Sequence, residues 1–246
     1  MSPGSRRAGR RQGGPVAGWW AEVLEAALDL AVPQRCAGCA RPGWAWCPEC
    51  AGLSRRPSLV VPAVVPCRAA ADHAGPVGRA VVAYKDEQVR RLAGPLSELL
   101  AGAVRDSLGA HLRHRGPVWV VPMPARRSAL RSRGADHVGV LAARAAGHLR
   151  RRGISAHRCS ALTLVRSSAD QVGLSRTRRQ ANVAGTMRAL APPAGVVILV
   201  DDVVTTGATL GEAVRALRRA GREVDGAATV TWSPGPRRLA SVADRD

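Results

Sequence analysis

The chain has 246 residues and a formal net charge of +19, and 46% of its residues are hydrophobic. This length and apolar content allow one medium-sized domain with a buried core plus a small appendage, and they exclude disorder throughout the chain. No apolar run approaches the ~18 residues that a membrane span needs. We therefore expect a soluble, cytoplasmic protein without membrane insertion.

The positive charge comes from 37 basic residues, of which Lys85 is the only lysine. So strong a preference for arginine is consistent with biased coding, and the total charge therefore says little about partners. The positions of the arginines are more informative, because they gather at the start of the chain and in two loop-like stretches, Arg126–Arg133 and Arg166–Arg179. Such groups suit either a solvated face or a multiply charged anionic ligand.

The first part of the chain does not have the pattern of a folded domain. Residues 1–18 are rich in Gly, Pro, Ser and Arg and predict a disordered basic arm. Residues 19–57 are expected to hold a short apolar helix at Trp19–Ala31 and then a cysteine-rich module. Pro57 and Pro62 mark a linker after it.

From residue 58 to residue 233 the pattern alternates between helix and strand. Apolar residues at helical spacing predict helices over 76–84, 89–103, 138–145 and 210–217. Short apolar runs predict strands over 119–121, 162–165 and 196–200. This alternation predicts an α/β domain with a mostly parallel sheet flanked by helices, and residues 234–246 are expected to form a flexible tail.

Four cysteines form two Cys-x2-Cys pairs, Cys36 with Cys39 and Cys47 with Cys50, separated by seven residues. At this spacing four thiolates can surround one ion tetrahedrally, which favours a structural zinc site with no position left open for catalysis. Disulfides are one alternative, disfavoured by the expected location, and iron bound by the same ligands is another. Cys67 and Cys159 stand apart and are expected to be either buried thiols or residues without a role.

The segment after the third predicted strand carries the chemistry. Val196–Val200 predicts a strand buried on both faces, and Asp201 and Asp202 follow at its carboxyl end, where open α/β sheets bind ligands. Backbone N–H groups and the dipole of the next helix can cradle a phosphate, while the carboxylates suit vicinal hydroxyls or a divalent metal. The cradle residues are Val203, Val204, Thr205, Thr206, Gly207, Ala208 and Thr209.

Residues 197–210 resemble the phosphoribosyl pyrophosphate (PRPP) signature of type I phosphoribosyltransferases, and the cysteine module makes the chain similar to the competence protein F (ComF) family. Tyr84-Lys85, Val121–Pro124 with Arg131–Gly134, and Leu162–Asn182 also match, so the resemblance covers roughly residues 24 to 232. The chain departs from the family where Ala135-Asp136-His137 replaces Phe-Asn-Gln and where Met187 replaces Phe.

The resemblance implies a phosphoribosyltransferase-like fold and binding of PRPP with Mg2+. Asp201 and Asp202 would contact the ribose hydroxyls, and Thr205–Thr209 would hold the 5-phosphate. A nitrogen base would attack C1 of the ribose as pyrophosphate leaves. Candidates for binding the pyrophosphate are Arg179, with a catalytic role, and Met123, Arg126, Arg131 and Arg133 in the second loop.

Three functions remain open from the sequence. The first is an enzyme that transfers phosphoribosyl to an unidentified nitrogenous acceptor. The second is a nucleic-acid-binding or DNA-uptake accessory that uses the fold as a sensor or strand-binding surface, with Trp44 and Trp46 stacking on bases of single-stranded DNA. The third is a regulator that binds the ligand without chemistry. The sequence predicts neither the acceptor nor the oligomeric state.

Overall fold

The computed structural model of the protein describes residues 34–109, 116–125, 135–165 and 185–234. The expected basic arm, the helix predicted at Trp19–Ala31 and nearly all of the expected tail lie outside these ranges. So do four candidate ligand residues, Arg126, Arg131, Arg133 and Arg179.

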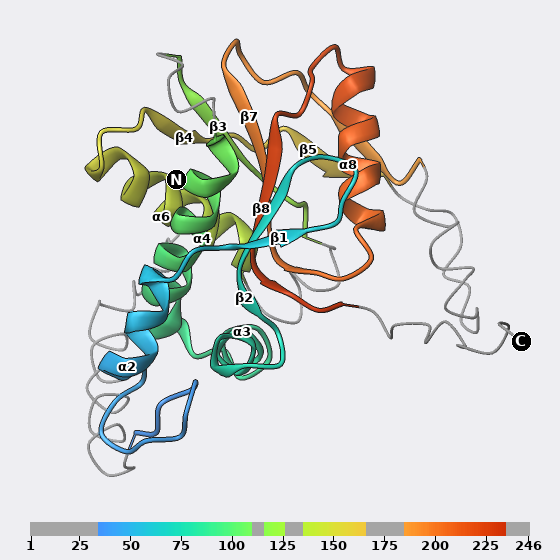
Figure 1. Ribbon diagram of the computed structural model, residues 1–246. Helices are drawn as coiled ribbons and strands as arrows, with labels where there is room; N and C mark the ends of the chain where they lie inside the picture. Colours follow the sequence, from blue (N-terminus) through green and yellow to red (C-terminus); the bar gives the residue numbers. More distant parts are fainter. Residues whose placement is uncertain (1–33, 110–115, 126–134, 166–184, 235–246) are drawn as a thin grey trace, which may run out of the picture.

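Helices and strands alternate along most of the described chain (Figure 1). In chain order the elements are α2 Pro48–Ala51, the 3-10 helix η1 Gly52–Arg55, β1 Leu59–Val61, β2 Cys67–Asp72, α3 Pro76–Asp86, the 3-10 helix η2 Arg90–Leu92, α4 Ala93–Leu108, β3 Val118–Pro122, α6 His137–Arg151, β4 Ala156–Arg158, β5 Leu162–Leu164, β6 Met187–Ala189, β7 Val196–Val204, α8 Ala208–Arg219 and β8 Gly226–Trp232. None of the described helices is long and apolar enough to cross a membrane.

Six strands form one sheet in the order β1-β2-β8-β7-β3-β4. The strands β2, β8, β7, β3 and β4 are parallel to their neighbours, and only β1, at one edge, runs antiparallel. The mostly parallel sheet predicted from the alternating pattern is therefore confirmed. Because five strands are parallel, their carboxyl ends lie along one edge, where ligands of open α/β sheets bind.

Helices cover both faces of the sheet, and β7 shows how alternate side chains serve the two layers. Val196, Ile198 and Val200 pack into a core with α3, α4 and α6 on one face. Val197 and Leu199 pack into a second core with α8 on the other face (Figure 1). All five side chains are almost fully buried, which explains why this strand is continuously apolar rather than alternating.

The strands β5 and β6 form a separate antiparallel pair that packs on α8, outside the main sheet. The strand predicted at 162–165 is thus present, but it does not belong to the central sheet. The residues 166–184, which connect the two strands, are outside the described ranges.

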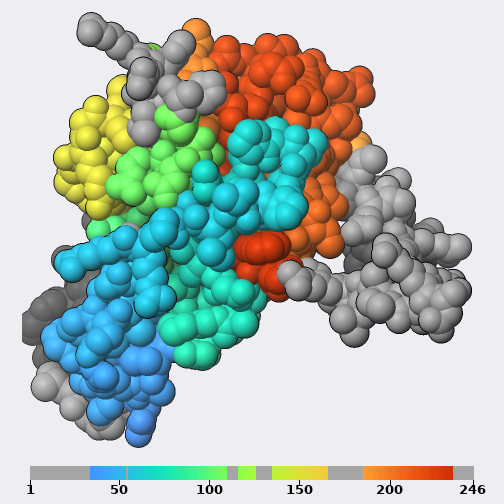
Figure 2. Space-filling model, viewed as in Figure 1, coloured from blue at the N-terminus to red at the C-terminus, as the bar shows by residue number. Residues whose placement is uncertain are grey.

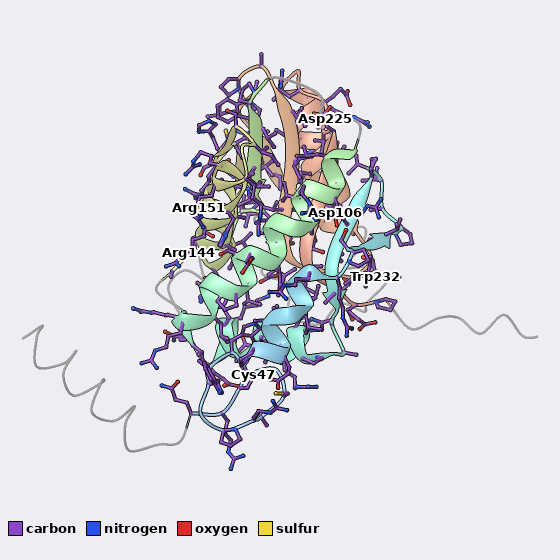
Figure 3. All side chains as sticks on the ribbon, turned by 60° about the vertical axis from the view of Figure 1, so that its left-hand side comes forward. Cys47, Asp106, Arg144, Arg151, Asp225 and Trp232 are labelled. Atoms are coloured by element: carbon purple, nitrogen blue, oxygen red, sulfur yellow. The ribbon has the colours of Figure 1, made fainter. Side chains whose placement is uncertain are left out.

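The structure also contains strands that the sequence did not predict, including β2 and β8 inside the sheet. The expected linker between Pro57 and Pro62 contains β1. Ser58 just before it donates two hydrogen bonds to the Asp106 carboxylate on α4, at 3.2 Å from its amide and 2.8 Å from its hydroxyl. This stretch is therefore attached to the domain rather than free of it, and Figure 3 shows Asp106 beside it.

The cysteine module, residues 34–55, forms a lobe beside α3 (Figure 2). The Arg79 guanidinium on α3 donates two hydrogen bonds to the Gly38 carbonyl, from Nε at 2.8 Å and from Nη2 at 2.5 Å. A methyl group at Gly38 would lie 2.8 Å from the Cys50 sulfur and 3.2 Å from Pro76, so the close approach needs glycine. The module thus rests on the helix that begins at the carboxyl edge of the sheet.

Candidate functional site

The acidic pair Asp201 and Asp202 lies within β7, which continues to Val204. The expectation that the strand ends before these residues was wrong, because their backbone still pairs with β8 through Asp201 with Thr229 and Val203 with Thr231. Hydropathy changes at residue 201, but the hydrogen-bond ladder does not end there. The carboxyl groups are therefore held by a strand rather than by a loop.

Asp202 is buried, with 5% of its surface exposed. Its Oδ2 atom forms an ion pair with Lys85 Nζ at 2.9 Å, and Lys85 comes from the last turn of α3. Behind the carboxylate, the Thr231 hydroxyl donates to the Asp202 carbonyl at 3.3 Å. A buried carboxylate needs such a counter-ion, because an isolated ion pays a large desolvation penalty.

Asp201 has a different environment from its neighbour. Its Oδ1 accepts a hydrogen bond from the Asp202 amide at 2.8 Å, and its side chain is half-buried. Desolvation, followed by the negative charge of Asp202, raises the pKa of Asp201 well above its ordinary value. The two adjacent carboxyl groups are thus not equivalent: one is paired with a cation and the other retains its proton more readily.

The loop after β7 has the geometry of an anion cradle. Gly207 adopts the left-handed conformation, with φ of 73°, and is the N-cap of α8. Thr205, Thr206 and Thr209 are exposed around it. The amides of the first turn of a helix have no intrahelical acceptor, so those that open α8 can bind an anion.

A polar network lies behind the site and was not predicted from the sequence. The Thr231 hydroxyl that reaches Asp202 is also 2.9 Å from Nδ1 of His73, which follows β2. Thr229 is also buried in β8 and donates to the Thr231 carbonyl at 3.0 Å. The sequence feature that could have indicated this network is the presence of two threonines in an otherwise apolar strand, because buried hydroxyls require partners.

Tyr84 lies next to Lys85 in α3 and is buried. Its hydroxyl donates to the His137 carbonyl at 3.3 Å, and the two rings meet edge to face. Burial raises the pKa of Tyr84 to about 12, so its hydroxyl is neutral at physiological pH. The Tyr84-Lys85 pair thus divides its roles: the tyrosine fixes α3 against α6 and the lysine reaches the acidic pair.

Met123 lies at the carboxyl end of β3, beside β7 in the sheet. Its side chain is buried, and its amide donates to the Val200 carbonyl at 2.9 Å, so this N–H group is engaged by the sheet. A cavity of about 260 Å³ adjoins it, and its lining includes Asp136 and Arg158, which form an ion pair at 3.4 Å. Asp136 also caps α6 by accepting from the Gly139 amide at 2.9 Å.

Glu212 joins α8 to the β5–β6 pair. Its buried carboxylate accepts from the Met187 amide at 2.9 Å and from Arg215 at 2.6 and 2.7 Å. Arg215 also donates to the Met187 carbonyl at 3.3 Å. The Arg215 guanidinium, more than the opposing desolvation, lowers the pKa of Glu212. This contact could not be predicted from the sequence, because Glu212 has the pattern of an ordinary polar position of a surface helix.

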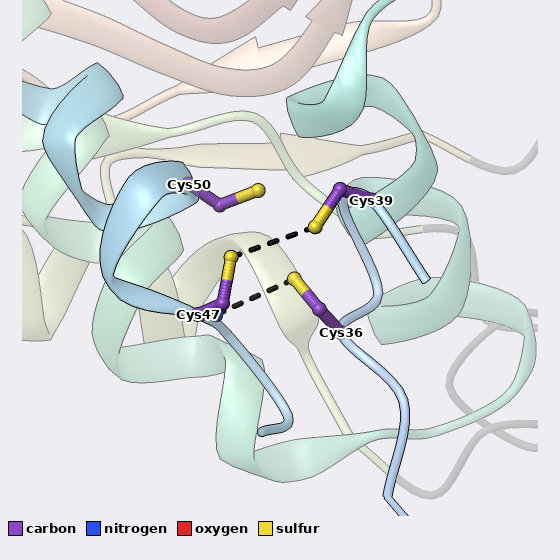
Figure 4. Close-up of side chains that lie close together, drawn as sticks. All are labelled: Cys36, Cys39, Cys47 and Cys50. Carbon is purple, nitrogen blue, oxygen red and sulfur yellow. Dashed lines mark hydrogen bonds between the residues drawn. The ribbon is translucent and has the colours of Figure 1, made fainter. Parts of the chain in front are cut away.

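The four cysteines of the module come together as predicted from their spacing (Figure 4). Their sulfur atoms all lie within 4.8 Å of one another, and Cys36, Cys47 and Cys50 are buried. The four could bind a metal ion such as zinc. Trp46 packs against the cluster, whereas Trp44 is 52% exposed.

The thiols of this cluster differ in acidity. Burial opposes ionisation of Cys36, but backbone amides from Cys47, Cys39 and Gly38 lower the pKa of its thiol to about 6. Burial and the neighbouring cysteines raise the pKa of Cys50. A thiolate beside three further sulfur ligands is the arrangement that a divalent metal stabilises, because the metal replaces the protons.

The cysteines outside the module have no such neighbours among the described residues. Cys67 is buried in β2, and burial raises the pKa of its thiol to about 11. Cys159 is only half-buried, so the expectation of a buried thiol fits the first better than the second.

A comparison with protein-family models and a comparison with curated proteins gave no match to this chain.

Proposed function

We propose that the carboxyl edge of the sheet binds PRPP together with Mg2+, on a domain of the type I phosphoribosyltransferase fold. The observation that carries this proposal is the order of groups at the end of β7. A strand-held acidic pair is followed at once by a left-handed glycine and the amino end of α8. Acceptors for sugar hydroxyls and donors for a phosphate are therefore a few residues apart, as a sugar phosphate requires.

Each half of the ligand has a partner in this arrangement. Asp201 and Asp202 accept hydrogen bonds from the ribose hydroxyls, and the amides and hydroxyls of Thr205–Thr209 hold the 5-phosphate. Mg2+ enters with the pyrophosphate and neutralises part of its charge. Arg126, Arg131, Arg133 and Arg179 are the proposed cationic contacts of the pyrophosphate, with Arg179 also stabilising its departure.

The proposed reaction transfers the phosphoribosyl group to a nitrogenous acceptor. The bond between C1 of the ribose and the pyrophosphate oxygen breaks with its electron pair remaining on pyrophosphate. The acceptor nitrogen then forms the new bond to C1 and releases a proton. Because the transition state has oxocarbenium character, most of the catalysis would come from positioning and from cations around the leaving group.

A screen with labelled PRPP tests the transfer. Free bases and amines are supplied one at a time with Mg2+, and pyrophosphate release is measured. We expect one acceptor class to raise release above the rate of hydrolysis, and the Asp201→Asn, Asp202→Asn variant to abolish the increase. Binding of PRPP without release for any acceptor would refute transfer and leave a ligand-sensing protein.

The cysteine cluster supports a second proposal about the same chain, namely a structural zinc ion held by Cys36, Cys39, Cys47 and Cys50. All four positions of a tetrahedral ion are then filled by protein. We assign the zinc ion a structural role because the module that it would hold together contains Gly38, whose carbonyl accepts a hydrogen bond from Arg79. Zinc would thereby stabilise the contact between the module and α3.

Nucleic-acid binding is the second candidate function, favoured by the surface of the cysteine module. Trp44 is exposed, and a hollow of about 1170 Å³ between the module and α3 has Arg35, Arg79, Arg90 and Arg91 in its lining. Exposed indoles stack on bases while arginines neutralise phosphates. Single-stranded DNA binding that weakens with salt and with Trp44→Ala would support this function, and no binding at low salt would exclude it.

A further inference from the structure

Lys85 is the only lysine among the 37 basic residues of the chain. Arginine and lysine are not interchangeable: a guanidinium is a flat fork that contacts both oxygens of a carboxylate, whereas an ammonium is a compact point charge. The other 36 basic residues are all arginine. The single lysine forms an ion pair with the buried carboxylate of Asp202. Lys85 therefore differs from the other 36 basic residues in the shape of its cation.

The geometry of the contact supports this distinction. Lys85 Nζ is 2.9 Å from Asp202 Oδ2, and the two side chains are 28% and 8% exposed. The ion pair joins the ammonium to one carboxylate oxygen, Oδ2. A point charge of this kind does not require the second oxygen. A guanidinium at the same place would engage both oxygens and compete with a hydroxyl donor.

The helix that carries Lys85 is fixed at both sides. The Arg79 guanidinium holds α3 to the Gly38 carbonyl of the cysteine module, and the Tyr84 hydroxyl holds it to the His137 carbonyl of α6. Tyr84 is almost fully buried, so the backbone from which the lysine extends has little freedom. The backbone position from which the Lys85 side chain extends toward Asp202 is therefore fixed.

We propose that Lys85 is a positioning residue that holds the Asp202 carboxylate in the orientation in which its second oxygen accepts a ribose hydroxyl. The proposal rests on the proposed function, since it concerns the same acidic pair. Lys85 acts through Asp202, and its role requires both the positive charge and the small size of an ammonium group.

Two measurements test the proposal, one with and one without the ligand. Incorporation of 15Nζ-labelled lysine gives one side-chain signal, because the chain has one lysine. Asp202→Asn should shift this signal, while the distant Glu223→Gln should leave it unchanged. Calorimetry then compares the affinity for Mg-PRPP of wild type, Lys85→Met and Lys85→Arg. The matched control is Arg151→Met, which removes an exposed cation from the last turn of α6 (Figure 3).

We expect both Lys85 variants to weaken Mg-PRPP binding by about tenfold or more, and Arg151→Met to bind as wild type does. Wild-type affinity in Lys85→Arg would overturn the proposal, because charge alone would then suffice. An unshifted lysine signal in Asp202→Asn would overturn it as well, even if Lys85→Met failed to fold. No binding by wild type would instead refute the proposed function, which separates the two failures.

Discussion

Gly207 provides the sharpest test of the loop that follows β7. Its φ of 73° lies in the left-handed region, where a residue with a Cβ atom costs roughly 1–2 kcal/mol. A methyl group there would meet only Ala63, at 3.9 Å, so no clash adds to this cost. Alanine also restricts the unfolded chain, which offsets about 0.4–1 kcal/mol. We therefore expect Gly207→Ala to lower the free energy of unfolding by about 1 kcal/mol.

Gly211, four residues later, is the matched control. It lies within α8, and a methyl group there would meet only Val64, at 4.0 Å. Because alanine is the better residue inside a helix, Gly211→Ala should raise the free energy of unfolding by roughly 0.5–1 kcal/mol. The same chemical change is thus expected to have opposite signs at two positions of one segment.

Urea denaturation measures the stability change of both variants. We expect the denaturation midpoint to change, while the dependence of the unfolding free energy on urea concentration stays the same. In a thermal scan each kcal/mol corresponds to a shift of about 2–4 °C for a domain of this size. A Gly207→Ala variant as stable as Gly211→Ala would refute the left-handed loop, and with it the cradle that the loop forms.

Three further predictions concern the rest of the structure. The purified protein should contain about one zinc per chain by elemental analysis, and Cys47→Ser should lower this content; metal-free wild type would contradict the site. Glu212→Ala should cost about 2 kcal/mol at pH 7, because the Met187 amide and Arg215 lose their acceptor, whereas the exposed Glu223→Ala should cost under ~0.5 kcal/mol. Because folding lowers the pKa of Glu212, the stability lost in Glu212→Ala should be full above pH 4.5 and should shrink as the pH falls further. A loss of stability that does not change with pH would contradict the ion pair. Cys67, whose thiol has a raised pKa, should not react with a disulfide reagent at pH 8 until the protein unfolds, as peptide mapping of the labelled site would show; rapid labelling at Cys67 in the native protein would show that β2 is exposed.

Periodicity predicted the parts of the fold that bury large side chains. The helices α3, α4, α6 and α8 are present, because each has a continuous apolar face that packs on the sheet. The strands β3 and β7 have uninterrupted apolar runs because helices cover both their faces. These patterns arise within one element and can be read without knowing its neighbours.

The strands β2 and β8 were missed because small residues build them. The sequences Cys-Arg-Ala-Ala-Ala-Asp and Gly-Ala-Ala-Thr-Val-Thr-Trp contain no run of large apolar side chains. All of β8 except Trp232 is buried nonetheless, and β2 is largely covered, because α4 packs over both strands and small side chains allow that approach. A methyl group at Gly226 would lie 2.5 Å from the Ser107 hydroxyl on α4. Burial here comes from close packing of backbones, which hydropathy does not measure.

The sequence indicates candidate residues where they are consecutive, but it does not indicate the contacts between residues that are far apart in the chain. Asp201 to Thr209 form one segment, and the four cysteines lie within one short stretch, so spacing alone indicated both. The ion pair between Lys85 and Asp202, the His73–Thr231 contact and the Glu212–Met187 contact join distant parts of the chain. Only the fold brings these groups together.

The central claim is that the end of β7 binds PRPP, and calorimetric titration tests it most directly. Mg-PRPP is titrated into folded wild type and into the Asp201→Asn, Asp202→Asn variant, with circular dichroism to show that both are folded. We predict binding by wild type and its loss in the variant. No binding by folded, metal-loaded wild type, or equal binding by the variant, would contradict the assignment of this edge of the sheet to a sugar phosphate.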